Sequence, residues 1–63
     1  MTIAEKLLAF RVKHDLSYRK MAKLMGRSRS TVYELEKGRR GCYPRTERRI
    51  ELAIEQYESE QLP

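Results

Sequence analysis

The feature that most constrains the fold is a helix-ending signal followed almost at once by a helix-starting signal. Gly26 suits the end of a helix, because glycine readily adopts the left-handed backbone that closes one. Only Arg27 separates it from Ser28, a residue type that caps helix starts. Ser17 is a similar cap for the preceding helix. This spacing predicts two short helices joined by a tight turn within residues 17–37, as in a helix-turn-helix.

Two further helices are expected to flank this pair. Thr2 and Glu5 fit a capping box at the start of the first, which should run to about His14. Asp15 tolerates left-handed backbone and is expected to end it. Pro44 suits the first turn of the last helix. The fold class is therefore all-α, a compact bundle of four to five short helices, and its expected core comprises Ile3, Leu7, Phe10, Met21, Ala22, Met25, Val32, Leu35, Ile50, Ala53, Ile54 and Tyr57.

The length of the chain, 63 residues, allows one small domain. We expect that domain to span residues 1–58, with residues 59–63 as a short C-terminal tail. The longest apolar run covers four residues, Leu7–Phe10, whereas a membrane-spanning helix needs roughly 20. The start lacks the basic and apolar regions of a secretory signal. A cytoplasmic protein with no membrane association is therefore expected.

Neither a cofactor nor a metal is expected. The chain has one cysteine, Cys42, and one histidine, His14, which cannot form an internal disulfide or complete a zinc site. It also lacks a Ser/His/Asp set, a carboxylate pair and a glycine-rich phosphate loop, so we expect no enzyme activity. For Cys42 two interpretations stay open: an inert loop cysteine, which is favoured, or a redox switch with a lowered thiol pKa.

The charge of the chain is unevenly distributed. Fourteen Lys and Arg face nine Asp and Glu, a net charge of +5. Residues 1–49 hold all the cations and five of the anions, while residues 50–63 hold four glutamates and no cation. A basic body favours a polyanionic partner, with nucleic acid first and an anionic membrane surface second. The alternative is a solvated surface without a partner.

One side of the helix that follows Ser28 is expected to be polar and exposed. At 100° per residue, Val32 and Leu35 face inward together. The opposite side then carries hydroxyl, guanidinium, carboxylate and ammonium groups, which suit base edges and phosphates better than packing. These residues are Arg29, Ser30, Tyr33, Glu34 and Lys37.

The segment Leu16–Gly38 resembles the Cro/repressor-type, or Xre-like, helix-turn-helix family. The resemblance extends over about residues 3–57 and implies a lambda repressor-like DNA-binding domain. It rests on Ala22, Gly26, Ser28, Glu36 and Gly38 at the family's spacing, and on Ile3, Leu7, Phe10 and Arg11 upstream.

The resemblance also implies roles for individual residues. Bases would be read by Arg29, Ser30 and Glu34. Arg29 would bind a guanine, and Glu34 would either accept a hydrogen bond from a cytosine amine or sharpen specificity by repelling phosphates. Arg11 would pair with Glu36 as a structural pair and face a phosphate. For each cation the alternative is a solvated surface charge. The expected contacts to the DNA backbone are Arg11, Tyr18, Arg19, Thr31, Tyr33, Lys37, Arg39, Arg40 and Arg45.

Several positions depart from the family pattern. Tyr18 replaces a glutamine that braces the first base-reading residue, which puts that bracing in doubt. Residues 58–63 are too few for the fifth helix that often forms the dimer interface. Leu8 and Val12 lie on the outer side of the first helix, either as isolated exposed residues or as a surface covered by Tyr57, Leu62 or a second protomer. We expect a homodimer, at least on a pseudo-palindromic operator.

The expected function is that of a sequence-specific regulator of transcription that binds double-stranded DNA. By resemblance it would be a Cro-like repressor of a phage, plasmid or other mobile element. It would act by promoter occlusion, with no small-molecule ligand. The alternative is a protein-interaction module, such as an antitoxin or adaptor, that docks through the acidic segment 50–60. Single-stranded or RNA binding is disfavoured, because the sequence offers no aromatic stacking platform.

Overall fold

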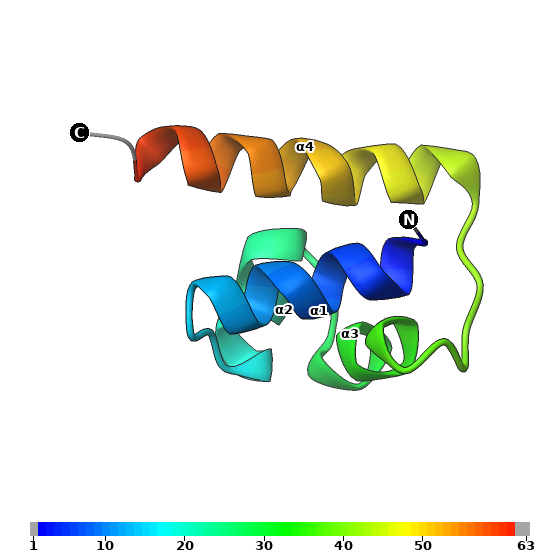
Figure 1. Ribbon diagram of the computed structural model, residues 1–63. Helices are drawn as coiled ribbons and strands as arrows, with labels where there is room; N and C mark the ends of the chain where they lie inside the picture. The colour runs from blue at the N-terminus through cyan, green and yellow to red at the C-terminus, as the bar shows by residue number, and fades with distance from the viewer. Residues whose placement is uncertain (1, 62–63) are drawn as a thin grey trace.

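The computed structural model describes residues 2–61 and contains no strand in that range. Three helices lie close together, and the long fourth helix runs along one side of them (Figure 1). The expected all-α bundle is confirmed, with four helices. They are α1 (Ile3–Lys13), α2 (Tyr18–Met25), α3 (Arg29–Glu36) and α4 (Pro44–Glu60).

Side-chain caps determine where the first three helices begin. The Thr2 Oγ1 accepts the Glu5 backbone N–H at 3.2 Å, and the Glu5 carboxylate accepts the Thr2 backbone N–H at 3.0 Å. That second hydrogen bond lowers the pKa of the Glu5 carboxyl. Ser17 and Ser28 each accept, through Oγ, the backbone N–H three residues ahead, at 3.1 and 3.2 Å. The predicted caps are therefore confirmed, and each satisfies a backbone donor that the helix leaves without a partner.

Left-handed backbone ends α1 and α2 where the sequence predicts. Asp15 has a φ of 51° and Gly26 a φ of 68°. A Cβ at Gly26 would meet no atom within 4 Å, so its backbone conformation, and not lack of space, favours glycine there. The Arg27 backbone N–H then donates to the Ala22 carbonyl at 3.0 Å. The chain can therefore start α3 directly at Arg29.

The last helix is reached by a connection over residues 37–43, which turns at Lys37 and Gly38 and then crosses one end of the molecule (Figure 1). Pro44 occupies the first turn of α4, as expected, and no side chain caps the helix start. The helix extends to Glu60, so two residues of the segment expected as a tail are helical.

A single apolar core joins the four helices. Leu7 and Met21 are completely buried, and Val32 is 1% exposed. The remaining buried hydrophobic residues are Phe10, Ala22, Leu35 and Ile50, against which Ile3, Leu16, Met25, Ile54 and Tyr57 are partly buried. Most of the core residues expected from helical spacing thus contribute to one cluster, with the α4 residues after Ile50 at its edge.

One charged residue lies within this core. The Glu36 side chain, at the end of α3, is only 1% exposed. Arg11 on α1 donates to its two carboxylate oxygens from Nε at 3.1 and 3.0 Å, and to one of them from Nη2 at 2.9 Å. These hydrogen bonds raise the pKa of Arg11. The pair connects α1 to α3 by charge-assisted hydrogen bonds that satisfy both groups.

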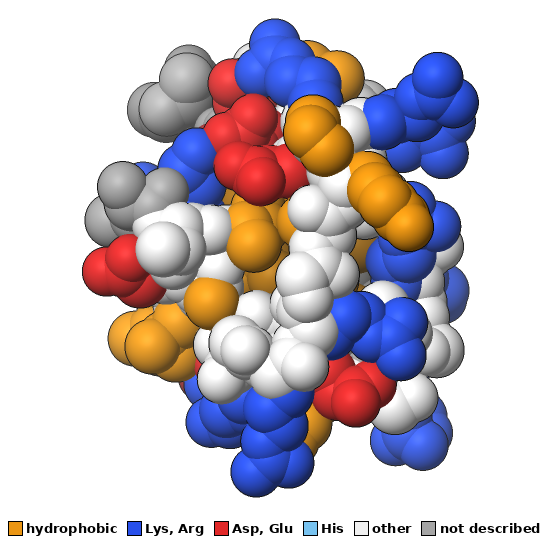
Figure 2. Space-filling model, turned by 90° about the vertical axis from the view of Figure 1, so that its right-hand side faces the viewer, with side chains coloured by type: hydrophobic (Ala, Val, Ile, Leu, Met, Phe, Trp, Pro, Cys, Tyr) orange, Lys and Arg blue, Asp and Glu red, His pale blue; other side chains and the backbone are white. Residues whose placement is uncertain are grey.

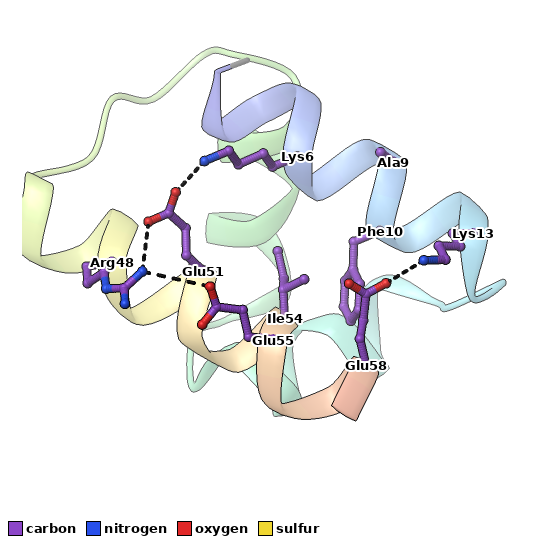
Figure 3. Close-up of a pocket in the computed structure, with 9 residues that line it drawn as sticks. All are labelled: Lys6, Ala9, Phe10, Lys13, Arg48, Glu51, Ile54, Glu55 and Glu58. Atoms are coloured by element: carbon purple, nitrogen blue, oxygen red, sulfur yellow. Dashed lines mark hydrogen bonds and ion pairs between the residues drawn. The ribbon is translucent and has the colours of Figure 1, made fainter. Parts of the chain in front are cut away.

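A second set of ion pairs connects α1 to α4. Figure 3 shows Lys6 beside Glu51 and Lys13 beside Glu58 across the groove between these helices. The His14 Nε2 also lies 3.0 Å from Glu58. Pairing with Lys6 lowers the pKa of Glu51, and hydrogen bonds from His14 and Lys13 lower that of Glu58. Much of the acidic charge of α4 is therefore balanced within the domain.

Replacing Leu7 by alanine should test the core. Because Leu7 is completely buried, we expect Leu7→Ala to reduce the free energy of unfolding by about 2–5 kcal/mol. Leu52→Ala is the matched control, since Leu52 is 47% exposed, and should change it by no more than about 0.5 kcal/mol. Urea unfolding followed by circular dichroism measures both. Equal losses of unfolding free energy in Leu7→Ala and Leu52→Ala would contradict the described core.

Removing Arg11 should be far more harmful than removing an exposed arginine. Arg11→Ala leaves the Glu36 carboxylate buried without its partner, which should cost about 3 kcal/mol of unfolding free energy. Arg19→Ala, on the exposed side of α2, should cost less than about 0.5 kcal/mol in the same urea experiment. A loss from Arg11→Ala no larger than that of the control would mean that the pair does not hold α1 to α3.

Candidate nucleic-acid interface

The outward side of α3 is polar and uncovered among the described residues. Arg29, Ser30 and Tyr33 are exposed and Glu34 is half-exposed, whereas Val32 and Leu35 are buried. The exposed side predicted from helical spacing is therefore present. It offers a guanidinium, a hydroxyl and a carboxylate along one helix, which are groups able to bind base edges.

Three hydroxyl groups cluster at the start of α3. The Ser28 Oγ donates to the Thr31 Oγ1 at 2.8 Å and lies 3.3 Å from the Ser30 Oγ. Thr31 itself is half-buried. Hydroxyls both donate and accept, so this group could pair with a phosphate oxygen or a base edge while keeping the helix cap.

Tyr18 and Tyr33 place an aromatic pair beside these hydroxyls. Their ring centroids are 5.4 Å apart with the rings inclined at 67°. The Arg11 guanidinium carbon lies 4.7 Å from the Tyr18 centroid, so the core ion pair also supports this ring. A shallow groove, here called the α3 groove, is lined by Tyr18, Ser28, Arg29, Ser30, Tyr33 and Glu34.

Tyr18 therefore has a packing role that the sequence did not indicate. In place of a bracing glutamine the chain has a ring held between Arg11 and Tyr33. Among residues 2–61, no hydrogen bond links Tyr18 to Arg29. The bracing of Arg29 implied by the family pattern is thus replaced by an aromatic wall.

Glu34 and Arg40 form an exposed ion pair. The Arg40 Nη2 donates to the Glu34 Oε1 at 3.2 Å across the turn that ends α3, and both side chains are at least 40% exposed. Exposed pairs of this kind contribute about 0–1 kcal/mol, so a phosphate or a base could displace either partner. The structure therefore pairs a predicted base reader with a predicted backbone contact.

Most of the cations expected to contact the DNA backbone are exposed around this region; Arg11 is the exception, because it is partly buried and paired with Glu36. Lys37 and Arg39 lie 5.5 and 5.8 Å from the centroid of Tyr33. Arg45 lies farther along the chain, in the first turn of α4. Figure 2 shows Lys and Arg side chains around much of the rim of one end of the molecule. Within the described part of the chain, no ion pair is formed by Arg19, Arg29, Lys37, Arg39 or Arg45.

The structure adds three cations that the sequence interpretation missed. A second hollow lies beside the α3 groove, and these three cations line it together with Arg19 and Arg29. Its position between the starts of α2 and α3 extends the basic surface. The only sequence signal was their closeness to Arg19 and to the turn. The missed residues are Lys20, Lys23 and Arg27.

Cys42 has the properties of an inert loop cysteine. It is half-buried and packs against the core. Burial, and to a lesser extent the charge of Glu47, raises the pKa of its thiol. A raised pKa leaves less of the reactive thiolate, which favours the inert loop cysteine over a redox switch with a lowered thiol pKa.

The chain was also compared with known proteins. Residues 2–61 include no helix long and apolar enough to cross a membrane, and no group of three or more potential metal-binding side chains. No curated protein and no solved structure matches the chain. A family model described as a helix-turn-helix domain matches residues 2–58, almost the whole chain. The chain therefore belongs to the helix-turn-helix domain family, whose members include many DNA-binding regulators.

Proposed function

We propose that the protein is a sequence-specific regulator of transcription that binds double-stranded DNA with α3 in the major groove. The observation that carries the proposal is the uncovered polar side of α3, where Arg29 is exposed beside a hydroxyl cluster. Arg29 would bind a guanine through its O6 and N7 atoms, with Ser30 and Glu34 reading neighbouring bases.

Phosphate contacts would surround these base contacts. They would come from the backbone-contact residues proposed from the sequence, together with Lys20, Lys23 and Arg27 in the adjoining hollow. Each phosphate neutralised releases counterions, so affinity should fall with salt at a slope near −0.9 per phosphate. The balance of charges supports this arrangement, because Glu36, Glu51 and Glu58 are paired with cations of α1.

The proposed mode of regulation is Cro-like repression in the cytoplasm by occlusion of a promoter. Occlusion requires only that the protein occupies the promoter duplex, because a bound protein excludes the polymerase from it. A DNA-binding surface is sufficient for this role. No small-molecule inducer is part of this proposal.

We also propose a homodimer on a pseudo-palindromic operator. Leu8 and Val12 are 44% and 64% exposed on one side of α1. Tyr57 does not cover them, because it packs against Phe10 and His14. Leu62, the other candidate cover within the chain, lies outside the described residues. A second protomer is the proposed occupant of this surface.

The alternative, docking of a basic partner through segment 50–60, has less support. Glu51 is paired with Lys6, and Glu58 with Lys13 and His14. Glu55 lies 3.9 Å from Arg48 on the same helix. A partner would have to replace these internal pairs, which reduces the charge available for docking.

Substitution of Arg29 should change sequence preference. We expect Arg29→Ala to weaken binding to a duplex selected from a random library by about 1–3 kcal/mol and to relax preference at one base pair. Binding to a shuffled duplex should change much less. Fluorescence anisotropy at fixed salt measures both affinities.

Arg19→Ala is the matched control, because Arg19 is an exposed proposed phosphate contact without a described ion pair. It should weaken both duplexes by about the same factor and lower the salt slope by about 1. Arg40 is less suitable, since its hydrogen bond to Glu34 would make its removal alter a base reader too. Equal effects of the Arg29 and Arg19 changes on the two duplexes would exclude α3 as the reader.

Sedimentation of the operator complex should give two protomers per site. Making Leu8 and Val12 polar together, as Leu8→Ser with Val12→Ser, should shift the complex toward one protomer and weaken binding, because the exposed apolar surface is lost. Leu52→Ser, at an equally exposed position on α4, should leave the stoichiometry at two. One protomer per site in the unmodified protein would contradict the dimer.

A further inference from the structure

Tyr33 is the large apolar group on the exposed side of α3. It follows Ser30 by three residues and Arg29 by four, so it lies one helical turn beyond them on the same side. The residue is 38% exposed, and its ring forms part of the lining of the α3 groove with Arg29 and Glu34. An apolar ring is therefore presented among the groups proposed to read bases.

The ring of Tyr33 is held in place by its neighbours. Tyr18 packs against it at 5.4 Å, and Tyr18 is itself contacted by Arg11, which is fixed by Glu36. Lys37 and Arg39 lie within 6 Å of the Tyr33 centroid. A supported ring loses little conformational entropy when it makes a contact, and its cationic surroundings suit a polyanionic partner.

The major groove offers one apolar group that matches such a ring. The C5-methyl of thymine projects into the groove, and proteins read it through apolar contacts that include aromatic side chains. None of the other three standard bases carries a methyl group there. A ring one turn from Arg29 would then meet a base pair close to the guanine that Arg29 binds.

We propose that Tyr33, supported by Tyr18, reads a thymine methyl group in the operator. The proposal rests on the proposed function and adds a base preference to the backbone role suggested for Tyr33. The two roles use different parts of the side chain: a phosphate contact needs the hydroxyl, whereas a methyl contact needs only the ring. They can therefore be separated by experiment.

The test replaces thymine by deoxyuridine, one position at a time, in a duplex selected from a random library. This change removes the methyl group and leaves every hydrogen-bonding atom in place. Burial of one methyl corresponds to about a fourfold change in affinity. We expect the unmodified protein to lose about fourfold at one thymine near the base pair whose preference Arg29→Ala relaxes.

Variants of Tyr33 assign that loss to the ring. In Tyr33→Phe the ratio of affinities for thymine and deoxyuridine should stay near fourfold, while in Tyr33→Ala it should fall to about one. Tyr43→Ala, the same change at an 82% exposed loop position, should keep the fourfold ratio. Circular dichroism of each variant confirms that it is folded before binding is compared.

Several results would overturn the proposal. They are a selected site without thymine near the position relaxed by Arg29→Ala, no loss on deoxyuridine substitution, a ratio that persists in Tyr33→Ala, and a ratio abolished by Tyr33→Phe. Each of these leaves the proposed function intact, because a selected site would still exist. If selection returned no preferred duplex, the proposed function would fail and the methyl contact with it.

Discussion

The hydrogen-bonded pair of Arg11 and Glu36 is the interaction on which the remaining structure depends. A domain of this length has an unfolding free energy of roughly 3–9 kcal/mol, so an uncompensated carboxylate in its core could remove most of its stability. Glu36 ends the helix that carries the proposed base readers, and Arg11 also supports the Tyr18 ring. One ion pair therefore couples the stability of the core to the shape of the α3 groove.

The positions of the glutamates explain how a chain of modest net charge can carry a strongly basic surface. Glu36 is buried against Arg11, while Glu51 and Glu58 are bound to cations of α1 (Figure 3). These three carboxylates are thereby neutralised away from the polar side of α3, where Glu34 is the acidic residue and is itself paired with Arg40. The arginines at the start of α2 and α3 are left to dominate the field at the polar side of α3.

Local signals made much of the fold predictable. Caps at Ser17 and Ser28 and the left-handed Gly26 depend on neighbouring residues, and all are where the sequence places them. Contacts between residues of different helices and turns were harder to predict from the sequence. The pairing of Glu34 with Arg40 and the packing of Tyr18 on Tyr33 have no local pattern, because they depend on how the helices and the turn are arranged in space. The exposed side of α3 was predictable, whereas the aromatic wall of its groove was not.

The single residue between the Gly26 and Ser28 caps has a consequence for recognition. Because so short a connection leaves few rotatable bonds, α3 cannot swing independently of α2. The helix proposed to read bases is then preorganised, and docking on DNA should require little additional ordering of the protein. Such rigidity would make the shape of the DNA a part of selectivity. A duplex whose major groove is too narrow would have to deform, since the short turn between α2 and α3 leaves the helix little freedom to adapt.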